Sequence, residues 1–113
     1  MQDWLTFVET TAFTKRLAAL GLEEALRDLQ LALLENPESG DVETGTGGLR
    51  KVRLGDPTRR KGKRGGARVH YLWLAHKSVI YLLSVYSKNE ASTLTAAQKQ
   101  RLRGVVALIK QSV

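Results

Sequence analysis

The sequence predicts a single α+β domain in which an antiparallel sheet is flanked by an N-terminal helical hairpin and a C-terminal helix. Residues 11–36 carry apolar side chains at helical spacing, and the segments between 49 and 86 are rich in alternating and β-branched residues. A second helical stripe follows Thr95. A chain of 113 residues is long enough for one core but not for two, so we expect one domain over residues 1–113. The predicted order is β-α-α-β-β-β-α.

The N-terminal third predicts a strand followed by two helices. Residues 4–9 are rich in aromatic and β-branched types, which favour a short strand. Thr10 or Thr11 can cap the first helix, and Gly21 interrupts it. The second helix ends before Pro37, because proline disfavours helical geometry in the residue that precedes it. Its apolar stripe consists of Leu22, Ala25, Leu26, Leu29 and Leu33.

The middle of the chain predicts three strands separated by glycine-rich segments. Residues 37–48 contain four glycines and one proline, which indicates a loop. Residues 49–54 alternate, so that Lys51 and Arg53 share one face of a strand. Residues 55–66 form a basic, glycine-rich loop with too little apolar content to pack. Two further strands, 67–75 and 79–86, are joined by a tight turn at Lys77 and Ser78.

The three strands are expected to form an antiparallel meander, because short loops connect them in sequence. We expect the helices to cover one face of this sheet and to leave the other face partly free. The last helix is opened by the capping box Thr95-Ala-Ala-Gln98. Its apolar stripe consists of Leu102, Val105, Val106 and Ile109.

Charge is distributed unevenly along the chain. Residues 1–47 carry a net charge of −6, whereas residues 48–113 carry +13, which gives the whole chain +7. Nine of the basic residues fall between Arg50 and Arg68. Clustered Lys and Arg attract polyanions and release their counterions, so this half of the chain is expected to bind phosphates.

Composition excludes several classes of chemistry. The chain has no cysteine, which rules out disulfides, thiolate catalysis and cysteine-bound zinc. Only His70 and His76 could supply nitrogen ligands, and no carboxylate lies near them in sequence, so we expect neither a metal nor a cofactor. No apolar run approaches 18 residues, and the acidic start is unlike a secretory signal. A cytoplasmic location without membrane contact is therefore expected.

The alternation of the three strands brings a particular set of side chains onto shared faces. Lys51 and Arg53 share one face of the first of these strands, and Arg68 and His70 share one face of the next. The end of the last strand places Ser84, Tyr86 and Lys88 together. If these three faces coincide, cations, a phenol and an imidazole meet, a combination that suits cleavage of RNA without a metal. Cations stabilise the charge that develops on the phosphorane, and the 2′-hydroxyl of RNA supplies the nucleophile.

Ordinary structural roles compete with this hypothesis at several positions. Basic alternation such as that of Lys51 and Arg53 is common on solvated strands, and tyrosines at strand ends are usually core-rim residues. His70 has no ionisable neighbour along its strand, so we expect it to be packed. Ordinary solvated charges are expected at His76, Lys77, Lys99, Arg101, Arg103 and Lys110.

Three motifs in a fixed order resemble one known family. They are Gly45-Thr-Gly-Gly-Leu-Arg-Lys-Val-Arg53, Gly62-Lys-Arg-Gly-Gly-Ala-Arg-Val69, and Ile80 to Glu90 followed by Leu94-Thr95. Together with the Asn36 to Asp41 loop they resemble the RelE/HigB toxins of type II toxin–antitoxin systems over nearly the whole chain. The resemblance implies a RelE-like fold and an mRNA interferase that cleaves mRNA at the ribosomal A site.

The same resemblance implies particular roles and partners. The implied cleavage proceeds by attack of the 2′-hydroxyl on the scissile phosphate, and a cognate antitoxin with an acidic contacting segment neutralises the toxin. The implied catalytic residues are Lys51, Arg53, Arg68, Tyr86 and Lys88. The general base is expected to be Lys51, then Tyr86, then Lys88. Contacts with RNA or the ribosome are expected from Arg50, Arg59, Arg60, Lys61, Lys63 and Arg64.

Two other functions are compatible with the sequence. ParE-type toxins of the same fold inhibit DNA gyrase and cleave nothing themselves. A plain RNA- or ribosome-binding module would use the basic face only to hold phosphates. The cations grouped with Tyr86 favour the nuclease, because a toxin that only binds a protein has no need of them.

Overall fold

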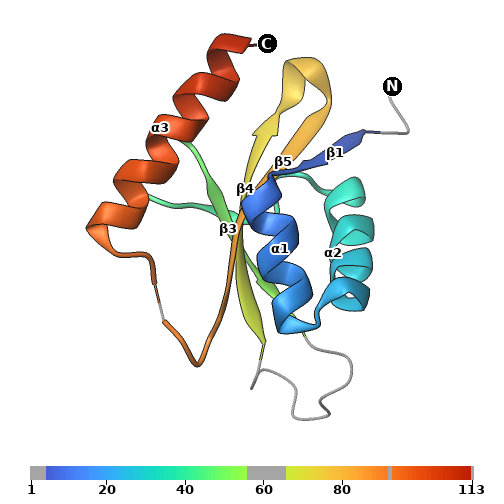
Figure 1. Cartoon of the computed structure of the whole chain (residues 1–113). Coiled ribbons are helices and arrows are strands. Elements are labelled where there is room, and N and C mark those ends of the chain that lie inside the picture. Colours follow the sequence, from blue (N-terminus) through green and yellow to red (C-terminus); the bar gives the residue numbers. More distant parts are fainter. Residues whose placement is uncertain (1–4, 56–65, 92, 113) are drawn as a thin grey trace.

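The computed structural model describes residues 5–55, 66–91 and 93–112, and it confirms the α+β class (Figure 1). Its elements, in chain order, are β1 (Thr6–Glu9), α1 (Thr11–Leu20), α2 (Glu23–Glu35), β2 (Asp41–Val42), β3 (Arg50–Leu54), β4 (Ala67–Leu74), a 3₁₀ turn (Ala75–Lys77), β5 (Val79–Ser87) and α3 (Ala96–Ser112). The predicted order is therefore correct except for the added strand β2.

The described residues form one sheet with the strand order β1-β5-β4-β3-β2. β3, β4 and β5 are antiparallel neighbours, which confirms the predicted meander. β1 joins the other side of β5 in parallel. The expectation that residues 37–48 form only a loop is wrong, since Asp41 and Val42 pair with Lys51 and Arg50. A two-residue strand has no alternation to detect, so its sequence could not reveal it.

Local sequence signals explain where the helices begin and end. The Thr10 hydroxyl accepts a hydrogen bond from the backbone N–H of Phe13, and Gly21 ends α1 with a left-handed φ of 68°. The capping box is also formed. Thr95 N–H donates to the Gln98 side chain at 2.8 Å, and Gln98 N–H donates to the Thr95 hydroxyl at 3.1 Å.

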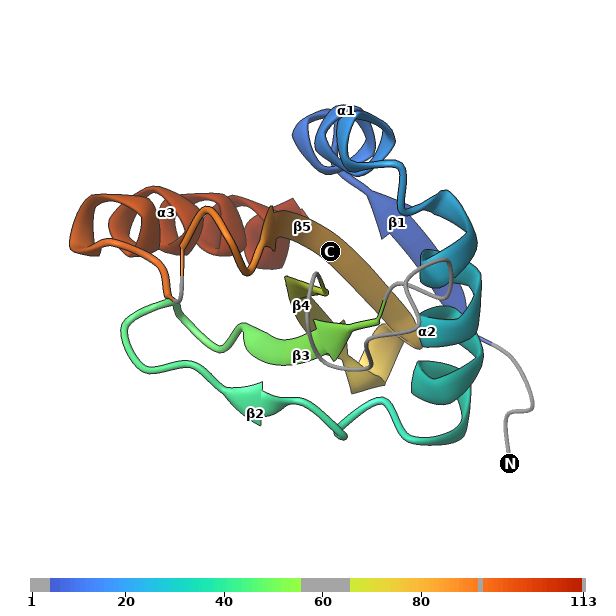
Figure 2. The same ribbon diagram turned by 90° about the horizontal axis from the view of Figure 1, so that it is seen from below.

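The helices lie on both faces of the sheet, which corrects the expectation that they cover one face (Figure 2). One core joins α1 and α2 to one face through Phe13, Leu33 and Tyr71. The second core packs Val106 of α3 against Leu72 on the opposite face. An apolar stripe identifies the side of a helix that is buried, but not the face of the sheet that receives it.

The strand β5 contains a β-bulge that sets the register of its second half. His70 pairs with Ser84, whereas the next residue, Tyr71, pairs with Leu82, so Leu83 is the extra residue of β5. The β4–β5 connection is the 3₁₀ turn followed by Ser78, whose φ is 54°. The bulge determines which β5 side chains oppose Arg68 and His70.

A buried tyrosine anchors the loop that follows α2. The Tyr71 hydroxyl donates to the Pro37 carbonyl at 2.7 Å and accepts from the Gly40 N–H at 3.0 Å. Gly40 must lack a side chain, because a Cβ there would lie 2.9 Å from the Lys51 carbonyl oxygen. The loop is thereby held against the sheet immediately before β2.

Replacement of Tyr71 by phenylalanine should destabilise the fold. The Tyr71→Phe variant leaves the buried Gly40 N–H without its acceptor, and an unsatisfied buried polar group costs about 1–3 kcal/mol. The free energy of unfolding, measured with urea, should fall by that amount. Tyr81→Phe, at a half-buried position of β5, is the matched control. Equal stability of the two variants would show that the hydroxyl of Tyr71 does not anchor the loop.

Candidate active site

The register of the sheet brings the predicted residues of three strands onto one face. Lys51 of β3 pairs with His70 of β4, and Arg53 pairs with Arg68. Across the next interface Arg68 pairs with Tyr86. Directly opposed residues of antiparallel strands project to the same side, so these faces coincide as expected. The shared face carries Lys51, Arg53, Arg68, His70, Ser84 and Tyr86.

This face is divided into an apolar part and a polar part. Leu72 and Leu74 lie on the same side of β4 as Arg68 and His70, because side chains alternate along a strand. The two leucines belong to the core that includes Val106 of α3. The polar residues therefore lie beside the helix-covered core and share its face of the sheet.

A carboxylate lies within this polar part. Glu43 Oε1 is 3.4 Å from Lys51 Nζ and 3.3 Å from His70 Nε2. Glu43 Oε2 is 3.2 Å from Lys99 Nζ on α3. The Glu43 side chain is only 11% exposed and that of His70 is fully buried. Residues of β3, β4 and α3 thus meet at one anion, and we call Glu43, Lys51, His70 and Lys99 the charged cluster.

The turn between β2 and β3 fixes the backbone of Glu43. Its N–H donates to the Leu49 carbonyl at 2.8 Å, and its carbonyl accepts from the buried Thr46 hydroxyl at 2.7 Å. Gly47 allows this turn, since it has a φ of 80° and a Cβ there would lie 3.3 Å from Arg103 Cγ. Lys110 Nζ also donates to the Gly47 carbonyl, so α3 contacts the turn at a second point.

Two expectations from the sequence are corrected by this cluster. His70 is packed, but it does have an ionisable partner, because Glu43 approaches it from the turn before β3. Lys99 is not an ordinary solvated charge, since it pairs with the same carboxylate. Glu43 was missed because it lies 27 residues before His70 in a segment expected to be a loop. The burial of Thr46, whose hydroxyl fixes the backbone of Glu43, is not visible in the sequence.

Burial and charge act in opposite directions on the two central groups. Burial raises the pKa of Glu43, but hydrogen bonds with His70 and Lys99 and the charge of Lys51 outweigh it, so the pKa lies below 4.5. For His70, burial lowers the pKa below 6.5 despite the hydrogen bond and the negative charge of Glu43. The pair at neutral pH is therefore a carboxylate beside a neutral imidazole.

Tyr86 packs against the cluster. Its ring stacks on His70 with centroids 5.9 Å apart and planes inclined by 28°. Burial, and then the negative charge of Glu43, raise the pKa of Tyr86 against the opposing effect of Arg68. Within the described residues, three buried polar atoms of this face lack a hydrogen-bond partner: Arg68 Nη1, His70 Nδ1 and Tyr86 Oη. Such atoms are rare in proteins, and here they are neighbours.

The remaining predicted residues are distributed differently. Arg53 is exposed, and Lys88 is exposed one residue beyond the end of β5. Arg50 belongs to the opposite parity of β3, and its guanidinium donates to the Gly40 carbonyl at 2.8 Å. The structure does not bring Arg50 to the shared face. Five predicted RNA-binding residues lie outside the described residues: Arg59, Arg60, Lys61, Lys63 and Arg64.

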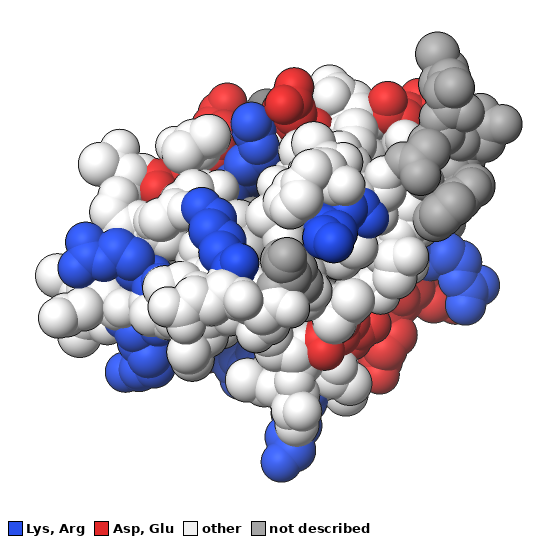
Figure 3. All heavy atoms as spheres, turned by 90° about the horizontal axis from the view of Figure 1, so that it is seen from above, with Lys and Arg blue, Asp and Glu red and all other residues white. Residues whose placement is uncertain are grey.

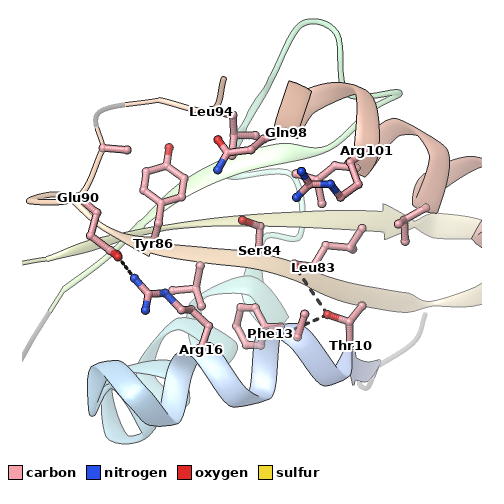
Figure 4. Close-up of a pocket in the computed structure, with 15 residues that line it drawn as sticks. Thr10, Phe13, Arg16, Leu83, Ser84, Tyr86, Glu90, Leu94, Gln98 and Arg101 are labelled. Carbon is pink, nitrogen blue, oxygen red and sulfur yellow. Dashed lines mark hydrogen bonds and ion pairs between the residues drawn. The ribbon is translucent and has the colours of Figure 1, made fainter. Parts of the chain in front are cut away.

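A groove of about 610 Å³ lies next to the shared face, between α1 and α3 (Figure 4). Ser84 and Tyr86 project into it from β5, while Arg101 enters from α3. Arg16 of α1 forms an ion pair with Glu90 at one side. The floor is apolar and includes Phe13 and Leu83. Tyr86 therefore borders both the charged cluster and the groove.

One face of the molecule gives little sign of this concentration of charge. On the face in Figure 3, Lys and Arg side chains form separate spots between uncharged atoms, and Asp and Glu lie mainly near the margins. Within the described residues, the closest grouping of cations that the contacts define is the one around Glu43.

Comparison with known proteins identifies the fold. No protein-family model matches the chain. Among solved structures, the chain is similar to that of the Escherichia coli toxin RelE in the free state. That RelE is a mutant in which two arginines are replaced by alanine. The two are 20% identical, the match covers 78% of this chain and 87% of that chain, and the TM-score is 0.57. The chain therefore has a RelE-like toxin fold, as the sequence motifs predicted.

Membrane-spanning helices and metal-binding clusters are both absent from the described residues. None of the helices there is long and apolar enough to cross a membrane. In the same residues, His, Cys, Asp and Glu side chains form no group of three or more that could hold a metal ion.

Acidification should destabilise the fold through His70 before it does so through Glu43. The folded-state pKa of His70 lies below its unfolded value of 6.5, so the unfolded chain binds the proton more readily. The contribution of His70 to stability is thus complete above pH 6.5 and is lost as the pH falls towards the folded pKa. Glu43 adds a further loss below 4.5.

Urea titrations between about pH 7.5 and about pH 5.5 measure the His70 contribution. The free energy of unfolding should decrease over this interval in the wild type and should change less in His70→Gln. His76→Gln, at an exposed histidine, should retain the wild-type slope. A slope in His70→Gln equal to that of the wild type would mean that His70 is not buried in its neutral form.

Proposed function

We propose that the chain is the toxin of a type II toxin–antitoxin system and a metal-independent endoribonuclease that cleaves mRNA at the ribosomal A site. The observation that carries this proposal is the strand register, which groups Lys51, Arg53, Arg68 and Tyr86 on one face. The similarity in fold to a toxin supports the same reading. The proposed reaction is attack of the 2′-hydroxyl on the adjacent phosphate.

Cations on this face would stabilise the transition state of that reaction. The phosphorane carries more negative charge than the phosphate from which it forms, so preorganised donors lower the barrier. Arg68 is the best placed donor, since its Nη1 is buried and has no partner within the described residues. Lys51 and the exposed Arg53 oppose His70 and Arg68 across the strands and add positive charge.

Proton transfer would be divided between Tyr86 and a lysine. Burial and the negative charge of Glu43 raise the pKa of Tyr86, so its phenol carries its proton at neutral pH. The phenol would give this proton to the 5′-oxygen leaving group as negative charge develops there. The general base is then Lys51, after its ammonium group has released a proton, with Lys88 beyond the end of β5 as the alternative. Cleavage in this manner leaves a 2′,3′-cyclic phosphate.

Binding would use groups around the catalytic face. The ring of Tyr86 borders the groove and can stack on an unpaired base, as aromatic side chains do in proteins that bind single-stranded RNA. Ribosomal or messenger phosphates would be held by Arg59, Arg60, Lys61, Lys63 and Arg64, whereas Arg50 lies on the opposite face and donates to the Gly40 carbonyl. We further propose a cognate antitoxin whose contacting segment is acidic, because the same positive charge that attracts RNA attracts such a peptide.

Loss of Arg68 should abolish cleavage without unfolding the protein. Removal of one charge-stabilising donor from a transition state costs on the order of 10²–10³ in rate. Primer extension on mRNA translated in the presence of purified protein should give discrete cuts within codons for the wild type. The Arg68→Ala variant should give cuts slower by that factor, while its circular dichroism spectrum is retained.

Arg27→Ala is the matched control, since it removes an exposed arginine of α2 on the other side of the sheet. Its cleavage rate should equal that of the wild type. Full activity in Arg68→Ala would refute the assignment of Arg68. Ribosome binding without cuts would identify a binding module, and a defect in DNA supercoiling would identify a gyrase inhibitor.

A further inference from the structure

Glu43 is the negative centre of a site made largely of cations. Its two carboxylate oxygens contact Lys51 and His70 on the sheet and Lys99 on α3, all within 3.4 Å. Its own backbone is held at both the N–H and the carbonyl by the turn that contains Thr46. A carboxylate with this many defined contacts has little freedom to change its position.

We propose that Glu43 is a positioning residue of the RNA-cleaving site, and that its carboxylate holds Lys51, His70 and Lys99 in one fixed arrangement. The inference rests on the proposed function for its catalytic consequence. The contacts themselves are independent of that function, so the two can be tested separately.

The contacts of the carboxylate argue against a direct role as general base. Oε1 is shared between Lys51 and His70, and Oε2 is engaged by Lys99. A proton on Glu43 would weaken all three of these contacts, and the same cations lower the pKa of Glu43. The group is therefore suited to holding charged neighbours rather than to accepting a proton from the substrate.

The contact with His70 extends the effect of Glu43 to Tyr86. A neutral imidazole can donate to Glu43 only if Nε2 carries the proton, so the contact sets the tautomer and the plane of the ring. Tyr86 stacks on that ring with centroids 5.9 Å apart. The phenol that we propose as general acid therefore packs against a side chain that Glu43 orients.

The contact with Lys51 acts on the proposed base. Lys51 is flexible and carries four methylene groups, and about a third of its side chain is exposed. The carboxylate restricts the ammonium group to the shared face beside His70. A chain of contacts thus runs from Glu43 to both groups that would move protons, and neither contact involves the substrate.

A competing role for Glu43 is purely structural, namely to attach α3 through Lys99. The two roles are separable because the contacts use different oxygen atoms. Lys99→Gln breaks the attachment and leaves the contacts of Oε1 in place. Glu43→Gln removes the charge from all three contacts. Glu24→Gln, at an exposed position of α2, changes the net charge by the same amount and is the matched control.

The first measurement is the titration of the His70 imidazole by nuclear magnetic resonance, which needs no RNA. The charged groups around His70 are Glu43 from the β2–β3 turn, Lys51 from β3 and Lys99 from α3, with the Tyr86 phenol stacked on the ring. Loss of the anion in Glu43→Gln removes the group that favours the imidazolium ion. His70 should therefore protonate at a lower pH than in the wild type, and an unchanged titration overturns the proposal.

The second measurement is single-turnover cleavage of mRNA on programmed ribosomes. Residues that orient catalytic groups through hydrogen bonds typically contribute about 10–100-fold. Glu43→Gln should lower the maximal rate by that factor and change the half-saturating ribosome concentration by less than about twofold. Lys99→Gln should slow cleavage much less, and Glu24→Gln not at all.

The remaining outcomes each decide the matter. Glu43→Asp keeps the negative charge on a shorter side chain, so its cleavage rate should lie between those of Glu43→Gln and the wild type. If Glu43→Gln fails to fold, Glu43→Asp takes its place, and a wild-type rate in Glu43→Asp would then overturn the proposal. Equal losses in Lys99→Gln and Glu43→Gln would overturn the proposal in favour of helix attachment. Wild-type rates in Glu43→Gln would overturn it while the nuclease assignment stands. A wild-type chain that cleaves nothing refutes the proposed function, and the His70 titration then decides alone whether Glu43 organises the cluster.

Discussion

Electrostatic balance around Glu43 is the constraint on which this molecule depends. Two strands, β3 and β4, bring Lys51, Arg68 and His70 to one face, and α3 packs on the same face and adds Lys99. Cations so close to a core would repel one another and would pay a desolvation cost without a counterion. One carboxylate, 11% exposed, offsets these effects. The short strand β2 and the Thr46 turn hold the Glu43 backbone beside β3, and this places the carboxylate against the sheet.

The same balance explains how a strongly bipolar sequence folds into a single domain. The acidic N-terminal part supplies the helical hairpin, and the basic part supplies the meander and α3. The two cores lie on opposite faces of the sheet, so most of the acidic side chains are separated from the basic face. Glu43 crosses from the acidic part into the basic site, and Asp41 lies opposite Lys51 on the same face. The groove beside Tyr86 then gives a ligand access from the side that α1 and α3 leave open.

The sequence was sufficient for the fold class, for the helix caps and for most of the residues on the shared face. Alternation has a period of two, so Lys51 with Arg53 and Ser84 with Tyr86 could be assigned to shared faces without a structure. The bulge at Leu83 could not be detected in the sequence. The prediction that Ser84 and Tyr86 share a face is nevertheless correct, because both residues follow the bulge. Glu43 and Lys99 were missed for a different reason. Their contact joins residues 56 positions apart, and neither periodicity nor charge density reports contacts of that range. The local sequence pattern also could not predict that α3 packs on the face of the sheet opposite to α1 and α2.

Cleavage chemistry tests the central claim, that this face catalyses attack of a 2′-hydroxyl on a phosphate. The direct measurement is mass spectrometry of the fragments that the wild-type protein releases from ribosome-bound mRNA. A parallel mRNA carries 2′-deoxyribose on the 5′ side of the cleavage position. The account predicts a 5′ fragment that ends in a 2′,3′-cyclic phosphate, a 3′ fragment that begins with a 5′-hydroxyl, and no cleavage of the deoxy-substituted mRNA. A 5′ fragment that ends in a 3′-hydroxyl, or cleavage of the substituted mRNA at the same position, would contradict it.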